Sequence, residues 1–232
     1  MRLLRFANLM PSRDFMSGLF ISFEGTEGGG KSTQVALLAD RLRKLGHRPR
    51  TLREPGGTSI GEEIRHLLKH SEANHLMMPE AELLLMNASR AQLVREVIQP
   101  ALTAGEIILC DRFYDSTTAY QGHGRQLDLE LVRSVIEFAV GPVRPHLTLL
   151  LSVPTQVSEE RRLARQASGT AGLRDRFEEA DRTFFERVEY GFQQIAEAEP
   201  GRVKLVDATQ SIEAVHDEIW RHVAVHLSPN CD

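Results

Sequence analysis

Short apolar runs alternate with stretches of helical periodicity along almost the whole chain, and no other feature constrains the fold as strongly. Five of these runs are rich in Ile, Leu, Val or Phe and have the length of buried strands: Leu19–Phe23, Pro49–Arg53, Glu106–Cys110, Leu147–Val153 and Val203–Val206. Strands that alternate with helices are typical of a parallel sheet covered by helices on both faces. The sequence therefore predicts an α/β fold built on a five-stranded parallel sheet.

Helical segments can be recognised by the spacing of their apolar residues and by the residues at their ends. The first strand leads into a segment with apolar residues at intervals of three and four: Val35, Leu38, Leu42 and Leu45. Gly46 is placed to end this helix. Asp128 and Ser211 have the side chains of N-cap residues and precede two later helical segments.

Composition excludes two classes of partner. The chain has 28 basic and 32 acidic side chains among its 232 residues, a formal charge of −4, and so lacks a chain-wide positive field for nucleic acid or anionic membranes. Its apolar runs are far shorter than the roughly 20 residues that span a bilayer. We therefore expect a soluble protein with no nucleic-acid or membrane partner.

The chain shows no internal repeat and no interdomain linker, so we expect a single domain over residues 18–232. Residues 1–17 are expected to be a disordered leader, or to lie mostly upstream of a start at Met16. A targeting segment is the alternative, because the leader is basic. The two cysteines, Cys110 and Cys231, have the spacing of neither a disulfide framework nor a metal site. A reducing, cytoplasmic location fits this composition best.

A glycine-rich segment follows the first strand and leads into the first helix. It reads Gly25-Thr26-Glu27-Gly28-Gly29-Gly30-Lys31-Ser32-Thr33 and matches the P-loop pattern G-x-x-x-x-G-K-[ST]. Glycines let backbone N–H groups approach phosphate oxygens, and the helix N-terminus adds partial positive charge. Lys31 adds a full charge near the β- and γ-phosphates, and the Ser32 hydroxyl is a suitable Mg²⁺ ligand. The segment predicts an ATP-binding loop; the alternative is a glycine-rich turn with a surface lysine.

Two charged motifs end other strands at the edge of the sheet where ligands of parallel sheets collect. Asp111 and Arg112 follow the third strand, where the aspartate could hold a hydrated metal ion and the arginine could grip a phosphate. A solvated structural ion pair is the alternative. Arg53 and Glu54 end the second strand in the segment Arg53-Glu54-Pro55-Gly56-Gly57-Thr58, which could also be an ordinary turn.

Together these motifs resemble the thymidylate kinase family, from about Leu19 to about Val223. The matching segments are Phe23-Glu24-Gly25 through Lys31-Ser32-Thr33, Arg53 to Thr58, Arg90-Ala91-Gln92, Asp111-Arg112-Phe113 with Ser116, and Ala119-Tyr120-Gln121-Gly122. Adenylate, shikimate and deoxynucleoside kinases share the fold class but lack this combination. The resemblance implies a three-layer P-loop NTP hydrolase-type fold, a homodimer, and Mg²⁺-dependent phosphorylation of thymidine monophosphate (dTMP) to dTDP by ATP.

The resemblance also implies roles for individual residues. Ser32 and Asp111 would hold the metal, and Lys31, Glu27 and Arg112 would act in catalysis. The acceptor dTMP would be bound by Glu27, Arg53, Pro55, Met86, Arg90, Arg112, Ser116, Thr117, Tyr120 and Gln121. Among these, the three arginines would grasp the acceptor phosphate, and Glu27 would lie near the deoxyribose 3′-hydroxyl; a solvent-facing Glu27 is the alternative.

Met86 departs from the family pattern, which often has phenylalanine there for thymine to stack on. A polarizable thioether could take the place of the ring against a pyrimidine. Met86 also continues a helical apolar stripe with Leu83, so a purely structural role is the alternative.

An arginine-rich region after the fourth strand is expected to form a lid over ATP, at about residues 161–176. Small and polar residues interrupt it between Ala167 and Gly172. In one branch of the family the lid supplies an arginine that the P-loop lacks, and Arg161 and Arg165 are the expected catalytic choices here. The alternative is a solvated helix face on which arginines pair with neighbouring glutamates.

Three other functions stay open on the sequence alone. A kinase for another nucleoside monophosphate or for deoxynucleosides would share all but the acceptor pocket. A P-loop ATPase or switch would hydrolyse nucleotide without an acceptor. A non-catalytic nucleotide-binding module fits less well, because Lys31, Ser32 and Asp111 are all present. For a kinase, phosphoryl transfer requires alignment and charge neutralisation rather than a general base.

Overall fold

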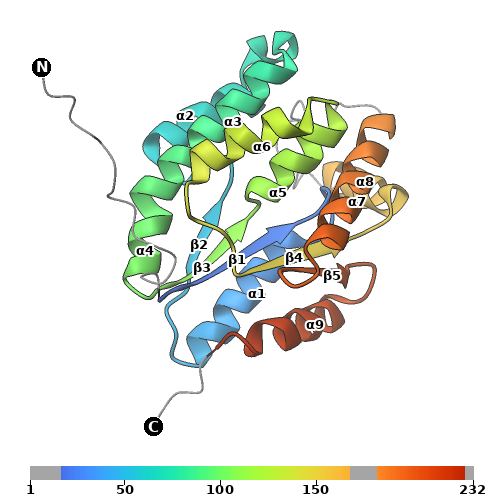
Figure 1. The fold of residues 1–232 in the computed structure, drawn as a ribbon. Coiled ribbons are helices and arrows are strands. Elements are labelled where there is room, and N and C mark those ends of the chain that lie inside the picture. Colours follow the sequence, from blue (N-terminus) through green and yellow to red (C-terminus); the bar gives the residue numbers. More distant parts are fainter. Residues whose placement is uncertain (1–16, 168–181, 228–232) are drawn as a thin grey trace, which may run out of the picture.

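Five parallel strands form the sheet of this computed structural model, in the order β2-β3-β1-β4-β5 (Figure 1). The structure describes residues 17–167 and 182–227. The strands are β1 (Leu19–Glu24), β2 (Arg50–Arg53), β3 (Ile107–Asp111), β4 (Leu147–Ser152) and β5 (Val203–Asp207). Each strand end lies within one residue of its predicted position, so the predicted sheet is confirmed.

Helices cover both faces of this sheet, as predicted. The helices α1 (Lys31–Lys44) and α9 (Ile212–Ala224) lie on one face (Figure 1). The other face is covered by α3 (Pro79–Leu93), α4 (Gln99–Thr103), α6 (Leu129–Val140) and α8 (Arg182–Ala198). The remaining segments are α2 (Ser59–Lys69), η2 (Glu72–Leu76), η3 (Val94–Ile98), α5 (Tyr114–Thr117), η4 (Thr118–Gly124) and α7 (Thr155–Ala167).

Side chains of β1 alternate between two cores, one on each face of the sheet. Ile21 and Phe23 pack with α1 and α9, whereas Phe20 packs with α3, α4 and α6. This alternation follows from the two-residue period of a strand. It also points Glu24 toward the face that carries α3 and α6.

The strand register brings the ends of β1, β2 and β3 together. Asp111 at the end of β3 is opposite both Phe23 of β1 and Arg53 of β2. The segments that follow these three strands therefore begin at one edge of the sheet, where parallel sheets bind ligands.

The predicted helix ends are confirmed, with one correction. The Asp128 and Ser211 side chains accept hydrogen bonds from the backbone N–H groups of Leu131 and Ala214. Gly46 (φ +87°) follows the end of α1. Leu45, which was predicted to belong to the apolar face of α1, is 50% exposed because it is the C-cap residue and its side chain lies beyond the packed turns.

No helix in the described ranges is long and apolar enough to cross a membrane. Apart from Ser17, the expected leader lies outside the described residues, as do the second half of the expected lid and Cys231. Of the expected lid arginines, only Arg161 has a described side chain. The side chains of the others lie outside the described part of the structure: Arg162, Arg165, Arg174 and Arg176.

Candidate functional site

The glycine-rich segment from Gly25 to Thr33, which we call the phosphate loop, runs from the end of β1 into α1. Gly25 has φ +123°, and a Cβ atom there would lie 2.2 Å from the carbonyl oxygen of Leu151. Gly30 is the N-cap of α1 at φ +85°. Both positions therefore require glycine, one for space and conformation and the other for conformation alone. Thr26 is buried, and Gly29 lies against the backbone of Leu151.

Lys31 folds back over the phosphate loop. Its Nζ atom donates hydrogen bonds to the carbonyl oxygens of Gly25 (3.1 Å) and Thr26 (2.8 Å). Burial lowers the pKa of the Lys31 ammonium to about 8, and the positive charge of Arg112 adds to the effect. A phosphate placed in the loop would offer this cation a full negative charge in place of two carbonyl dipoles.

Ser32 and Asp111 lie together at the mouth of the loop. The Ser32 hydroxyl donates a hydrogen bond of 2.7 Å to Oδ2 of Asp111. Mg²⁺ typically takes one or two protein oxygens and completes its six ligands with water and substrate phosphates. Among the described residues, no group of three or more His, Cys, Asp or Glu side chains could hold a metal ion. The oxygens present therefore suit a magnesium–nucleotide complex rather than a metal bound by protein alone.

Arg112 stands between the phosphate loop and the segment that follows β3. Its guanidinium donates to the Gly25 carbonyl oxygen (3.0 Å), to Oγ of Ser116 (3.0 Å) and to the Tyr120 hydroxyl (3.2 Å), and lies 3.7 Å from Oε1 of Glu27. Its φ of +71° is uncommon for a residue with a side chain. Such conformations cost energy and gather at functional sites, which supports a role for Arg112 beyond packing.

Two pockets adjoin at this edge of the sheet. The one that we call the outer pocket lies over the phosphate loop and is lined by Glu27, Gly28, Gly30, Lys31, Ser32, Thr33, Arg53, Glu54, Arg65, Lys69, Asp111 and Arg112. The inner pocket is lined by Glu27, Glu54, Pro55, Lys69, Met86, Arg90, Arg112, Ser116, Thr117, Tyr120 and Gln121. Four residues line both pockets and therefore mark the boundary between them: Glu27, Glu54, Lys69 and Arg112.

The inner pocket brings together every residue expected to bind the acceptor except Arg53, which lines the outer pocket and pairs with Glu62 at 3.0 Å. Sequence reasoning missed Lys69 and Arg65, which reach the pockets from α2. Nothing in the pattern of α2 distinguishes these two cations from surface residues. Glu54 was noticed as part of a motif but was given no role.

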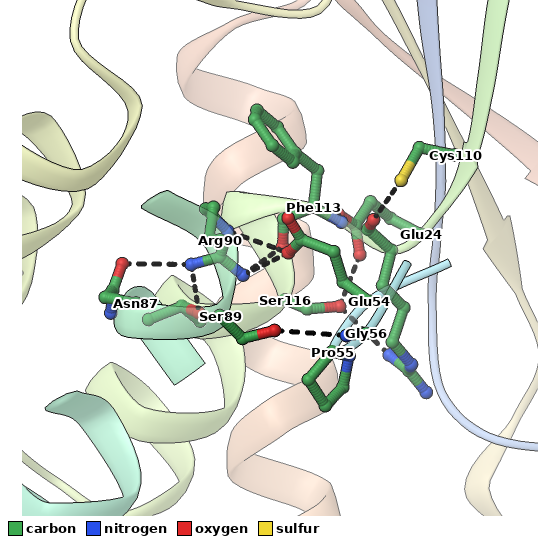
Figure 2. Close-up of polar contacts among 12 residues, drawn as sticks. Glu24, Glu54, Pro55, Gly56, Asn87, Ser89, Arg90, Cys110, Phe113 and Ser116 are labelled. Carbon is green, nitrogen blue, oxygen red and sulfur yellow. Dashed lines mark hydrogen bonds and ion pairs between the residues drawn. The ribbon is translucent and has the colours of Figure 1, made fainter. Parts of the chain in front are cut away.

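Arg90 is buried at the base of the inner pocket, with its side chain 2% exposed (Figure 2). Nε donates to Oε2 of Glu54 at 2.8 Å, and Nη1 donates to Asn87 and Thr117. Nη2 donates to the Phe113 carbonyl oxygen and lies 2.7 Å from Glu54. Four hydrogen bonds and the ion pair with Glu54 thus hold the guanidinium, so in this arrangement Arg90 shapes the pocket. Its contact with an acceptor phosphate stays a prediction.

Two buried glutamates frame this arrangement. Oε2 of Glu54 faces Arg90, whereas Oε1 is buried with no hydrogen-bond partner among the described residues (Figure 2). Glu24 accepts hydrogen bonds from the Phe113 N–H (2.7 Å) and the Ser116 hydroxyl (2.5 Å). Burial, followed by the negative charge of Asp115, raises the pKa of the Glu24 carboxyl to about 8. Ser116 is thus held between Glu24 and the guanidinium of Arg112.

One wall of the inner pocket, formed by Met86, Tyr120 and Gln121, is mostly aromatic and apolar, and we call it the aromatic wall. Tyr120 meets the rings of Phe184 and Phe192 edge to face at 6.0 and 6.2 Å. Burial raises the pKa of the Tyr120 hydroxyl to about 12, which keeps it neutral and able to donate. Met86 lines the pocket and also packs against this aromatic cluster, so the two roles expected for it are compatible. Gln121 completes the wall and bonds Oε1 of Glu82 at 2.8 Å.

The first helix of the expected lid, α7, touches the phosphate loop. Nη1 of Arg161 donates to the carbonyl oxygens of Ala208 (2.9 Å) and Gly28 (3.4 Å). The Ser158 hydroxyl donates to the Glu27 carbonyl oxygen. Arg161 is therefore beside the loop, as its predicted role requires.

Comparison with known proteins gives a consistent result. A family model described as "Thymidylate kinase" matches residues 23–219. Relatives named thymidylate kinase include one from Syntrophotalea carbinolica, 49% identical over 87% of this chain and 93% of the relative, and one from Kosmotoga olearia, 45% identical over 90% and 97%. The crystal structure of thymidylate kinase from Ehrlichia chaffeensis is similar with a TM-score of 0.71 and 29% identity, covering 89% of this chain and 98% of that one.

Proposed function

Because this chain belongs to the thymidylate kinase family, we propose that it transfers the γ-phosphoryl group of ATP to dTMP, giving ADP and dTDP. The observation that carries the proposal is the pair of adjoining pockets. One is lined by the phosphate loop, and the other has, beside its charged residues, the side chains of Met86, Tyr120 and Gln121, which suit a nucleobase. Arg112 lies on their common boundary, where a donor and an acceptor phosphate would meet.

The donor half of the site would hold ATP in the outer pocket. Backbone N–H groups of the phosphate loop would surround the β-phosphate, and Lys31 would leave the carbonyl oxygens of Gly25 and Thr26 for the β- and γ-phosphates. Ser32 and Asp111 would hold Mg²⁺, which when bound neutralises charge on the phosphates. Arg161 would add positive charge from α7.

The acceptor half would hold dTMP in the inner pocket, with its phosphate toward the boundary. Arg112 and Arg53 would bind that phosphate, and Arg90 would contribute only by giving up one of its protein partners. Glu27 would face the sugar from the loop. Met86, Thr117, Tyr120 and Gln121 would surround the base, and Ser116 would hold Arg112 in position.

The reaction needs no general base in this arrangement. An oxygen of the dTMP phosphate forms a bond to the γ-phosphorus, and the bond from that phosphorus to the β–γ bridging oxygen breaks. Lys31 and Arg112 neutralise the charge that spreads over the transferred group. Fixing both phosphates on one rigid sheet edge supplies the alignment that the displacement requires.

We further propose that the chain forms a homodimer in the cytoplasm. The packed helices α2, α3 and α6 carry exposed apolar side chains that a second copy could cover: Ile60, Leu67, Leu84, Leu131 and Phe138. Phe138→Asp should shift the mass measured by light scattering to that of one chain. The matched change Val225→Asp, at an exposed apolar residue beyond α9, should leave the mass unchanged.

An acceptor panel tests the proposed reaction. ADP formation is followed with ATP, Mg²⁺ and, in separate wells, dTMP, dUMP, dCMP, dGMP, AMP, thymidine or no acceptor. The proposal predicts rapid turnover with dTMP and slower turnover with dUMP. Equal ADP release without acceptor would overturn it in favour of an ATPase or switch, preference for another monophosphate would reassign the substrate, and no turnover in any well would leave a nucleotide-binding module.

A further inference from the structure

A buried ionic cluster lies directly behind the aromatic wall of the inner pocket. Glu82 of α3 is fully buried, and its Oε1 accepts hydrogen bonds from Nε2 of Gln121 (2.8 Å) and Nε of Arg125 (3.2 Å). Its Oε2 accepts a hydrogen bond from Nη2 of Arg125 at 3.0 Å. The Arg125 guanidinium lies 4.6 Å from the centre of the Phe184 ring, which holds it from the side of α8. None of these contacts belongs to the donor half of the site.

Glu82 determines which way the Gln121 side chain faces. The two ends of a carboxamide differ chemically, since the nitrogen only donates and the oxygen only accepts. A carboxylate paired with arginine can only accept, so the Gln121 nitrogen must face it. Turning the amide over would set its oxygen against Oε1 of Glu82 and leave two acceptors without a proton between them. Such an unmade buried hydrogen bond is costly.

Gln121 lines the inner pocket, and its oxygen has no hydrogen-bond partner among the described residues, although the residue is almost fully buried. The Gln121 oxygen is therefore a hydrogen-bond acceptor of fixed orientation in the inner pocket. Thymine and uracil carry a hydrogen at ring atom N3 and can donate to this oxygen. Cytosine has a lone pair at N3 and would meet it acceptor to acceptor.

We propose that Glu82, held by Arg125, is a positioning residue that locks the Gln121 amide and so selects pyrimidines with a hydrogen at N3 over cytosine. The inference rests on the proposed function, because it concerns the base of the acceptor. Glu82 touches no substrate and acts only through Gln121. The 5-methyl group of thymine plays no part in it, so the preference for dTMP over dUMP has a separate origin.

The variant Glu82→Gln tests this directly, since it keeps the shape of the side chain but can donate as well as accept. The Gln121 amide is then free to turn. In the full-length protein we expect the ratio of kcat/KM for dTMP to that for dCMP to fall by about tenfold or more. The ratio for dTMP to dUMP should stay at the wild-type value. Glu106→Gln, which breaks the exposed pair with Arg50, is the matched control and should change neither ratio.

Parallel loss of kcat/KM for all three acceptors in a folded Glu82→Gln protein would overturn the inference, because a merely structural role predicts that pattern. If this variant fails to fold, Arg125→Gln should produce the same change in the two ratios. The wild-type complex with dTMP supplies an independent measurement: its crystal structure must have the Gln121 oxygen within hydrogen-bond distance of N3, and any other contact overturns the inference. Failure of wild-type protein to phosphorylate dTMP would instead remove the proposed function itself.

Discussion

The phosphate loop and the inner pocket adjoin each other, but they are built in opposite ways. The loop is one continuous segment, Gly25 to Thr33, in which Gly25, Gly28 and Gly30 have positive φ angles, and its backbone N–H groups would be the main phosphate ligands. The inner pocket collects side chains from α2, α3, α5, η4 and the turns after β1, β2 and β3. In the proposed function, the first would recognise what all nucleotides share, and the second would recognise what distinguishes one acceptor from another.

The two regions also differ in which groups neutralise their charged side chains. The inner pocket contains the Arg90–Glu54 pair, with side chains 2% and 3% exposed, and the Glu82–Arg125 pair lies behind it. In the loop, the full charge of Lys31 rests on carbonyl oxygens. The positive charge of Lys31 would be neutralised by a bound phosphate, whereas the charges of the inner pocket are paired within the protein itself. The comparison predicts that substitutions in the pocket affect folding and those in the loop affect catalysis.

The largest effect on stability is expected from Arg90→Met, which would leave Glu54 buried without its cation. Removing one partner of a buried pair typically costs about 3–5 kcal/mol. Urea unfolding of the ligand-free protein measures this. Arg133→Met removes an exposed pair with Glu137 and should cost less than about 1 kcal/mol. Equal losses of unfolding free energy from the two substitutions would contradict this, because they would show that the buried pair stabilises the protein no more than an exposed pair does.

Lys31→Met is expected to act on catalysis instead. Losing one preorganised group that stabilises transferred charge typically lowers kcat by about 10²–10³-fold. Stability should not fall, because the change removes a buried cation that has no carboxylate bonded to it among the described residues. Lys44→Met, at an exposed position near the end of α1, is the control for both measurements. A kcat close to that of the wild type would show that the loop does not bind the reacting phosphates.

The pKa of Lys31 makes ATP binding depend on pH. Burial lowers this pKa to about 8 in the empty loop, and phosphate oxygens would raise it again. Above pH 8, binding must therefore take up a proton, and affinity should fall as pH rises, by at most about tenfold per pH unit. Calorimetry in two buffers with different heats of ionisation measures the uptake. Lys31→Arg keeps a permanent cation and should abolish the proton uptake. Uptake that persists in this variant would show that a group other than Lys31 binds the proton.

The smallest effect is expected from Met86→Phe, which separates the two roles of Met86. If the side chain faces the base, a ring can replace the thioether, and KM for dTMP should change by less than about threefold with little loss of stability. If Met86 only fills the core, the larger ring should destabilise the protein by about 1–3 kcal/mol with KM unchanged. Measuring KM and urea unfolding together distinguishes these outcomes.

Much of this molecule could be predicted from its sequence, and the two regions again differ. The strands and the phosphate loop are local patterns, so periodicity and motif spacing locate them to within a residue. The burial of Arg90 is not local, because its partner Glu54 lies on another element and a lone arginine in a helix gives no sign of it. Lys69 likewise reaches the pockets only because α2 folds back over the end of β2. Family resemblance, rather than any pattern in the chain, predicted the residues that line the inner pocket.

A crystal structure with Mg²⁺, dTMP and an unreactive ATP analogue would test the central claim most directly, that the two pockets are the acceptor and donor halves of one site. The account predicts thymine between Met86 and Gln121, the acceptor phosphate at Arg112, and the γ-phosphate beside Lys31 within reach of that phosphate. Binding of dTMP outside the inner pocket, or of the ATP phosphates away from the phosphate loop, would contradict it.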